Sequence, residues 1–197
     1  TGEGGMITTS DKDLAEKIRC LRDHGATMSD LQRHLGAKPY LLADHPEAGY
    51  NQRMTDIQAA LGIHQLARIE ENWLKREKIW NTYTESFANL PIDLPSHVSG
   101  GNIKHAHHLY TVLLRNDSPV SRDEFIVKMQ ENKIGTGVHY RSIPSFTYYH
   151  DTYGWKPQDF PNSTSIGDRT VSIPLAPGLS EKNIERIIEN VNSILNN

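Results

Sequence analysis

The sequence predicts a mixed α/β chain in which a strand and a helix come first, a long helix follows, and a small α+β unit ends the chain. An apolar stretch at 5–9 precedes a helical pattern, and an aromatic stripe over 66–90 repeats at three- and four-residue steps. Prolines and glycines at 91–101 separate this stripe from shorter strand and helix signals. The predicted boundaries are therefore 1–54, 55–90 and 91–197.

The first part of the chain is expected to hold one strand and one helix. Residues 5–9 read as the strand, and Ser10 is expected to cap the helix, with Asp13 at the capping-box position. Gly25 should end this helix, because glycine adopts the left-handed conformation without steric cost. No periodic pattern persists over 26–50, so we expect a long loop, and loops of that length tend to be functional or mobile.

A single long amphipathic helix is expected over 55–90. On its polar side, Glu71 and Lys75 form a favourable pair one turn apart. The apolar stripe carries more aromatic surface than one helix can cover, so we expect it to bridge two lobes. Its members are Leu66, Ile69, Trp73, Trp80, Tyr83, Phe87 and Leu90.

The last part of the chain is expected to form a small α+β unit. Strands are predicted at 108–115 and 137–141, separated by a helix that Ser121 caps. A loop rich in tyrosine, proline and aspartate is expected over 142–161. Ser180 then caps a final helix whose isoleucines, valine and leucine fall on one face.

Composition narrows the class of partner. The chain has 197 residues, a net charge of -3 and 23% charged residues, so it offers no basic field for nucleic acid or anionic lipid. No apolar run approaches the roughly 18 residues that span a bilayer, and no signal-peptide pattern begins the chain. Cys20 is the only cysteine and lies in a helical pattern, so we expect a small buried side chain and a cytoplasmic protein.

Two motifs that invite a functional interpretation lack the required spacing. The glycines at 2–5 precede a strand, whereas phosphate-cradling loops open a helix, so we expect a tight turn. His105, His107 and His108 crowd together without a recognised ligand spacing, so no metal site is predicted.

Two other segments carry groups suited to phosphates or sugars. His139 and Tyr140 can aim donors at a sugar or diphosphate, although a histidine satisfied within a domain seam is an equal alternative. Arg141 suits a phosphate contact. Asn51 and Arg53 place an amide and a guanidinium just before a helix start, which fits either an anion site or an ordinary capped helix.

Five stretches resemble, in order along the chain, motifs of the DegT/StrS family of sugar aminotransferases, which use pyridoxal phosphate. They are TGEGG at 1–5, GYNQRMTDIQAALG at 49–62, KHAHHLY at 104–110, GTGVHY at 135–140 and SIPLAPGLS at 172–180. The third stretch departs from the family pattern at His107, where an aromatic residue is more usual.

The resemblance implies the type I aminotransferase fold, with a large domain around a mixed seven-stranded sheet and a small C-terminal domain. Residues 1–54 would end the large pyridoxal-phosphate-binding domain, 55–90 would be the long bridging helix, and 91–197 would be the small α+β domain. The family acts as a homodimer with active sites at the subunit interface.

The resemblance also implies roles for individual residues. Asn51 falls where the family reaches across the interface to the cofactor phosphate, and Arg53 lies beside it. His139 and Tyr140 fall in the stretch that borders the sugar-nucleotide pocket, and Arg141 follows them.

One element of the family pattern falls outside the sequence. The Schiff-base lysine of the family precedes TTGEGG, so we expect it upstream of Thr1 and assign no catalytic residue here. The full-length parent would transfer an amino group, usually from glutamate, to a keto nucleotide-sugar. The alternative is a catalytically inactive structural or sugar-binding remnant of that fold. Either way, the apolar side of the strand at Met6 and Ile7 should drive the chain to pair with itself or with another chain.

Overall fold

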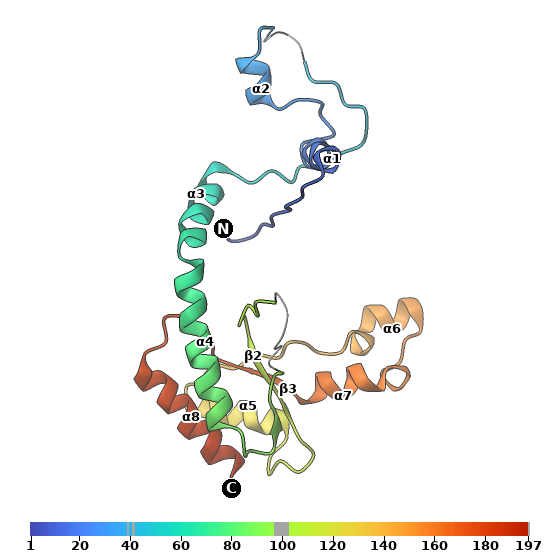
Figure 1. The fold of residues 1–197 in the computed structure, drawn as a ribbon. Coiled ribbons are helices and arrows are strands. Elements are labelled where there is room, and N and C mark those ends of the chain that lie inside the picture. Colours follow the sequence, from blue (N-terminus) through green and yellow to red (C-terminus); the bar gives the residue numbers. More distant parts are fainter. Residues whose placement is uncertain (39, 41, 97–102, 197) are drawn as a thin grey trace. The chain divides into compact units, whose positions relative to one another are not determined.

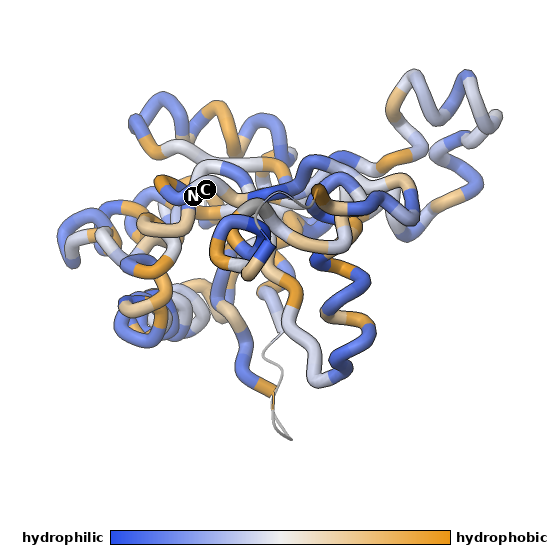
Figure 2. Tube along the Cα trace, turned by 90° about the horizontal axis from the view of Figure 1, so that it is seen from above, coloured by the Kyte–Doolittle hydropathy of each residue, from blue (hydrophilic) through white to orange (hydrophobic). Residues whose placement is uncertain are grey.

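The computed structural model describes residues 1–38, 40, 42–96 and 103–196. The chain divides into two compact units, Thr1–Arg68 and Ile69–Asn197, and each is described by itself (Figure 1). Hydrophilic and hydrophobic residues interleave along the helices, as amphipathic helices require (Figure 2).

The first unit contains three helices, α1 (Lys12–Arg22), α2 (Asp30–Leu35) and α3 (Asp56–Ala67). The cap of α1 is Asp11 and not the predicted Ser10, because the Asp11 carboxylate accepts a hydrogen bond from the Leu14 amide at 3.0 Å. The helix ends at Arg22, and both His24 (φ 59°) and the expected Gly25 (φ 75°) adopt the left-handed conformation. The Gly25 amide still closes the terminus by donating to the Cys20 carbonyl at 2.9 Å.

Two further predictions for this unit were wrong. Residues 5–9 form no strand, because no described segment of the unit offers them a hydrogen-bonding neighbour; Met6 and Ile7 lie 80% and 67% exposed. The region 26–50 is not all loop, because it contains α2. The signal missed there was Ser29 with Gln32, which forms a reciprocal capping box.

The helix predicted over 55–90 is two helices in the structure. It starts as expected, with Thr55 capping α3 through a capping box with Gln58. At Arg68 the amide bonds the Gln65 carbonyl, three residues back instead of four, and a second helix α4 (Ile69–Ser86) begins in the other unit. The Glu71–Lys75 pair forms as predicted, at 2.6 Å.

The aromatic stripe is buried only in its second half. Leu66 and Ile69 are 68% and 49% exposed, whereas Trp80, Tyr83 and Phe87 are buried. The change falls within α4, whose buried core residues begin only at Ile79 and pack with the sheet.

The second unit is built on a three-stranded antiparallel sheet with the order β1 (Ile92–Asp93), β2 (Tyr110–Leu114) and β3 (Thr170–Ile173). The helices α4, α5 (Arg122–Glu131) and α8 (Glu181–Leu195) contribute to one core with it. The buried residues of that core are Ile79, Trp80, Tyr83, Phe87, Leu90, Ile92, Tyr110, Val112, Leu114, Phe125, Met129, Ile134, Val171, Ile173, Ile187, Val191, Ile194 and Leu195.

Alternation along the strands separates two faces of this sheet. Tyr110 pairs with Ile173 and belongs to the core face, so the next pair, Thr111 with Ser172, lies on the opposite face. This second face carries hydroxyl groups, and residue 137 forms an isolated bridge to Ser172.

The predicted strand at 108–115 and the caps at Ser121 and Ser180 are confirmed. The predicted strand at 137–141 was wrong: only Gly137 pairs, and β3 takes the place beside β2. No strand was predicted over 170–173, where residues 172 and 173 entered only as the start of the motif at 172–180.

The loop predicted over 142–161 was also wrong. It contains the short helices η1 (Ile143–Ser145), α6 (Thr147–Tyr153) and η2 (Pro157–Asp159), and α7 (Pro161–Arg169) follows. Aromatic rings hold these turns together: Trp155 stacks on Tyr149 and Tyr153 at 5.8 and 5.2 Å between ring centroids.

The cap of α5 supplies a stability prediction. Ser121 Oγ accepts from the Glu124 amide at 3.3 Å, while Glu124 Oε2 accepts from the Ser121 amide at 2.8 Å. Ser121→Ala should lower the free energy of unfolding by about 1 kcal/mol in urea titrations. Ser118→Ala is the control, since the Ser118 hydroxyl has no partner among the described residues and its loss should change little. Equal effects of the two substitutions would contradict the capping role.

Hydrogen bonds that the Ser121 amide and the Ser121 hydroxyl donate to the carboxylate lower the pKa of Glu124. A carboxylate with a depressed folded-state pKa contributes stability above its ordinary pKa and loses it as the pH falls through the folded value. The Glu124 part of the cap should therefore fade only in acid, below the ordinary range of a glutamate.

Candidate functional site

The segment around Asn51 is held against the end of α1 as a short antiparallel pair. The Tyr50 amide donates to the Leu21 carbonyl at 2.6 Å, and the Gln52 amide donates to the Arg22 carbonyl at 2.9 Å. Asn51 itself lies opposite Asp23. The backbone therefore fixes where the Asn51 side chain starts.

Two glycines allow this pairing. A Cβ added to Gly49 would lie 1.9 Å from the Gly25 amide nitrogen, and a Cβ added to Gly25 would lie 2.0 Å from the Glu47 carbonyl oxygen. Backbone atoms cannot yield at such distances, and Gly25 also has φ +75°. Only glycine fits at either position.

Side-chain contacts also hold the segment before Asn51 against α1. Lys17 on α1 forms an ion pair with Glu47, and Cys20 Sγ lies 3.5 Å from Glu47 Oε1. The hydrogen bond from Lys17 lowers the pKa of Glu47, while desolvation, followed by the nearby Glu47 carboxylate, raises the pKa of the Cys20 thiol. Cys20 is half-buried, as a packing residue, and its raised pKa is the opposite of a reactive thiol's.

Arg53 binds three groups around Asn51. Its Nε donates to Asn51 Oδ1 at 3.2 Å, one terminal nitrogen lies 3.3 Å from Asp23 Oδ1, and the other lies 3.4 Å from His24 Nε2. Because a guanidinium can only donate, the oxygen of the Asn51 amide must face it. The amide NH₂ group therefore points away from Arg53, and Asn51 is exposed.

Asn51 and Arg53 present donors that a phosphate could accept. Asn51 Nδ2 has no hydrogen-bond acceptor within the described part of the chain, so it is available to an oxygen ligand. The Arg53 side chain is 45% exposed, but its charge is shared with the Asp23 carboxylate. The donor set fits part of a phosphate shell: one oriented amide donor and a partly neutralised positive charge.

Sequence reasoning named Asn51 and Arg53 and missed Asp23 and His24. These two lie about thirty positions earlier and meet Arg53 only through the pairing of residues 50–52 with the end of α1. The available signal was Gly25, whose conformation turns the chain directly after them. An open hollow beside the cluster is lined by Asp23, His24, Ala26, Met28, Ser29, Arg33, Leu42, Ala43, His45 and Arg53.

The second group of predicted site residues lies in the other unit. His139 is half-buried, and its Nδ1 lies 2.9 Å from Ser172 Oγ. Tyr140 is 75% exposed, and its ring meets the His139 ring edge-on at 4.9 Å. The exposed face of Tyr140 remains open to a ligand.

Arg141 is held by its own loop. Its Nε donates to Ser145 Oγ at 2.7 Å, and a terminal nitrogen donates to the Ser145 carbonyl at 2.8 Å. The guanidinium also lies 5.3 Å from the centre of the Phe146 ring. A phosphate contact by Arg141 would add to these bonds through its remaining N–H groups.

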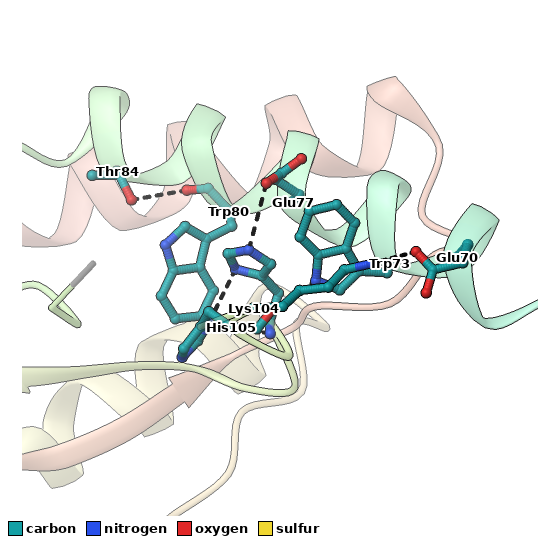
Figure 3. A network of polar contacts seen from close by, with 8 residues as sticks. Glu70, Trp73, Glu77, Trp80, Thr84, Lys104 and His105 are labelled. Carbon is teal, nitrogen blue, oxygen red and sulfur yellow. Dashed lines mark hydrogen bonds and ion pairs between the residues drawn. The ribbon is translucent and has the colours of Figure 1, made fainter. Parts of the chain in front are cut away.

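His105 and His107 pack against the tryptophan rings of α4 (Figure 3). Trp73 Nε1 donates to the His105 carbonyl at 2.6 Å, and Trp80 lies 4.9 Å from the His105 ring. His107 is 2% exposed and contacts both tryptophan rings. No group of three metal-ligating side chains occurs within residues 1–38, 40, 42–96 and 103–196.

None of the described helices is both long enough and apolar enough to cross a membrane.

Relatives of the chain are longer than the chain itself. It is 37% identical over 198 residues to the spore coat polysaccharide biosynthesis protein SpsC of Bacillus subtilis, and 36% identical over 196 residues to the uncharacterized protein MJ1066 of Methanocaldococcus jannaschii. Each match covers 99% of this chain and 50% of the relative. The chain therefore spans about half the length of these relatives.

The chain also matches somewhat less than half the length of the solved structures that it resembles. Spr1654 of Streptococcus pneumoniae, assigned as a sugar aminotransferase and solved in its PMP form, matches with a TM-score of 0.83 at 25% identity, over 95% of this chain and 46% of that one. Its PLP form matches with a TM-score of 0.81. An aminotransferase from Brucella abortus matches with a TM-score of 0.75 at 26% identity, over 96% and 45% of the two chains.

The family model of the DegT/DnrJ/EryC1/StrS aminotransferases matches residues 1–192. This match covers nearly the whole chain and settles the family. The chain belongs to the DegT/DnrJ/EryC1/StrS aminotransferase family.

Proposed function

We propose that this chain is the carboxy-terminal part of a pyridoxal-phosphate-dependent aminotransferase that transfers an amino group, from glutamate, to a keto nucleotide-sugar. Residues 1–54 end its cofactor-binding domain, 55–90 connect the domains and 91–197 form the small domain. The observation that carries the proposal is the Asn51 amide, whose NH₂ group Arg53 turns outward as a donor for the cofactor phosphate.

The proposal assigns each group of described residues to one ligand. Asn51 holds the phosphate, and Arg53 acts through Asn51 and adds part of its charge. His139, Tyr140 and Arg141 border the nucleotide-sugar. When bound, pyridoxal phosphate supplies the electron sink that amino transfer requires. The Schiff-base lysine is not among the residues assigned here.

We also propose a homodimer. The apolar side chains Ile57, Leu61, Ile63 and Leu66 on α3 are 52–78% exposed, which is unusual for a helix that faces water. The proposed cover is the rest of the large domain and a second subunit. Light scattering should give twice the mass of the complete polypeptide.

The test of the function compares the 197-residue chain with the complete translation product of its gene. We expect the complete product to carry a visible chromophore that borohydride reduces, and to transfer nitrogen from labelled glutamate to a keto nucleotide-sugar. A complete product with neither property would instead support a non-catalytic remnant of the fold.

Asn51→Ala in the complete product should weaken pyridoxal phosphate binding. One hydrogen bond to a charged group is worth about 1.5–3 kcal/mol, or roughly a ten- to hundredfold rise in Kd. Equilibrium dialysis against pyridoxal phosphate measures it. Asn190→Ala on α8 is the matched control, because within the described part of the chain that amide bonds the Arg186 carbonyl of its own helix and nothing else. An unchanged Kd in Asn51→Ala would remove the phosphate role from Asn51.

A further inference from the structure

His139 is clamped on the hydroxyl-bearing face of the sheet by contacts from several directions. Gly137 pairs with Ser172 through both backbone hydrogen bonds, at 3.0 and 2.7 Å, and the imidazole folds back over Gly137. A Cβ on Gly137 would lie 2.5 Å from His139 Cε1, so the ring occupies the space that a side chain would fill. Ser172 Oγ then meets Nδ1 at 2.9 Å.

The hydroxyl chain continues one residue beyond Ser172. Thr111 Oγ1 lies 2.8 Å from Ser172 Oγ across the β2–β3 pair. Ser172 is 5% exposed, so this link lies largely out of water. Three groups therefore share two hydrogen bonds in the order Thr111, Ser172, His139.

The two hydrogen bonds that link Thr111, Ser172 and His139 can be donated away from His139 or toward it. If His139 Nδ1 donates to Ser172, one hydroxyl hydrogen is left without an acceptor among the described residues: that of Thr111 if Ser172 donates to Thr111, or that of Ser172 if Thr111 donates to Ser172. If Thr111 donates to Ser172 and Ser172 donates to Nδ1, both hydroxyl hydrogens are used. In the second direction the imidazole proton is on Nε2, and the one donor left without a partner among the described residues is this Nε2–H, which a ligand oxygen can accept.

We propose that Thr111 and Ser172 are positioning residues that hold His139 as the Nε2–H tautomer, so that His139 donates a hydrogen bond to an oxygen of the ligand. Nε2 has no hydrogen-bond partner in the described part of the chain, and it is the nitrogen left free by Ser172. The identification of the ligand as the nucleotide-sugar rests on the proposed function. The ligand atom is an acceptor, either a diphosphate oxygen or a sugar oxygen.

The tautomer is read directly from imidazole nitrogen shifts in the full 197-residue chain, at alkaline pH, where histidines are neutral. The resonance that disappears in His139→Gln identifies His139. We expect Nε2–H to dominate in the unsubstituted chain, with a nuclear Overhauser contact between His139 Hε1 and the Gly137 α-protons. A dominant Nδ1–H form would overturn the proposal.

Matched variants isolate the hydroxyl chain. Thr111→Val keeps the shape but removes the donor, so the Nδ1–H fraction should rise by roughly fivefold, the worth of one neutral hydrogen bond. Thr111→Ser keeps the hydroxyl and should leave the tautomer unchanged. Ser172→Ala should remove the contact between His139 Hε1 and Gly137. Identical spectra in Thr111→Val and the unsubstituted chain would contradict the direction we assign.

Measurements of KM on the complete enzyme separate this proposal from the proposed function. In the complete enzyme, Thr111→Val should raise the KM for the nucleotide-sugar several-fold and leave the KM for glutamate unchanged. Inorganic pyrophosphate and free hexose, added separately, distinguish the two oxygen sources by which of them shifts the His139 Nε2 signal. If neither does and the KM is unchanged while the tautomer shifts as predicted, the positioning holds and the assigned ligand is wrong.

Discussion

Replacing Gly49 by alanine is expected to detach residues 50–52 from the end of α1 and to misplace the Asn51 amide. The new Cβ would lie 1.9 Å from the Gly25 amide nitrogen and 2.7 Å from its Cα, so one of the two backbones must move. Overpacking of this kind costs about 1–3 kcal/mol. The hydrogen bonds of the Tyr50 and Gln52 amides are the ones that this movement breaks.

Hydrogen exchange measures the effect residue by residue. We expect the amides of His24, Tyr50 and Gln52 to exchange roughly a hundredfold faster in Gly49→Ala, the equivalent of about 3 kcal/mol. Amides in α8 should exchange as before. Gly5→Ala is the control in the same unit, because a Cβ there meets nothing within 4 Å. Unchanged protection of these three amides would show that the close contact between the Gly49 and Gly25 backbones tolerates a side chain.

The sequence predicted best those elements that are specified locally. The capping residues Ser121 and Ser180 bond amides three positions away, so their pattern is visible in a short window of residues. The final helix has its apolar residues on one face and packs as its period predicts. Elements specified by a distant partner were missed: β3 is a strand only because β2 pairs with it, and residues 5–9 form none because no such partner is present among the described residues.

The contacts of the candidate-site residues show the same difference between local and long-range information. Asn51 and Arg53 lie two positions apart, so the sequence could suggest that they act together. The structure adds that Arg53 orients Asn51, which depends on Asp23 and His24 nearly thirty positions earlier. His139 was similarly visible as a polar ring, but Ser172 and Thr111, which determine its protonated nitrogen, come from β3 and β2. Long-range pairing carried this information, and no local pattern could supply it.

Trp80→Ala should be the most destabilising single change in the second unit. Trp80 is 3% exposed, and its ring contacts those of Tyr110, His107 and His105 at 4.8, 5.0 and 4.9 Å between centroids. It therefore joins α4 both to β2 and to the segment that precedes β2 (Figure 3). Truncating a buried tryptophan costs about 3–5 kcal/mol, through lost burial and the cavity left behind.

Urea unfolding followed by circular dichroism gives the free energy, since fluorescence would change with the tryptophan itself. Trp155→Ala is the matched control: the same side chain is removed, but Trp155 is 37% exposed, and its ring partners among the described residues, Tyr149, Tyr153 and Phe160, are all its neighbours in sequence. We expect its loss to cost less than half as much, because less apolar area returns to water and solvent already reaches the site. Similar costs for the two substitutions would mean that the ring contacts between α4 and β2 do not dominate this core.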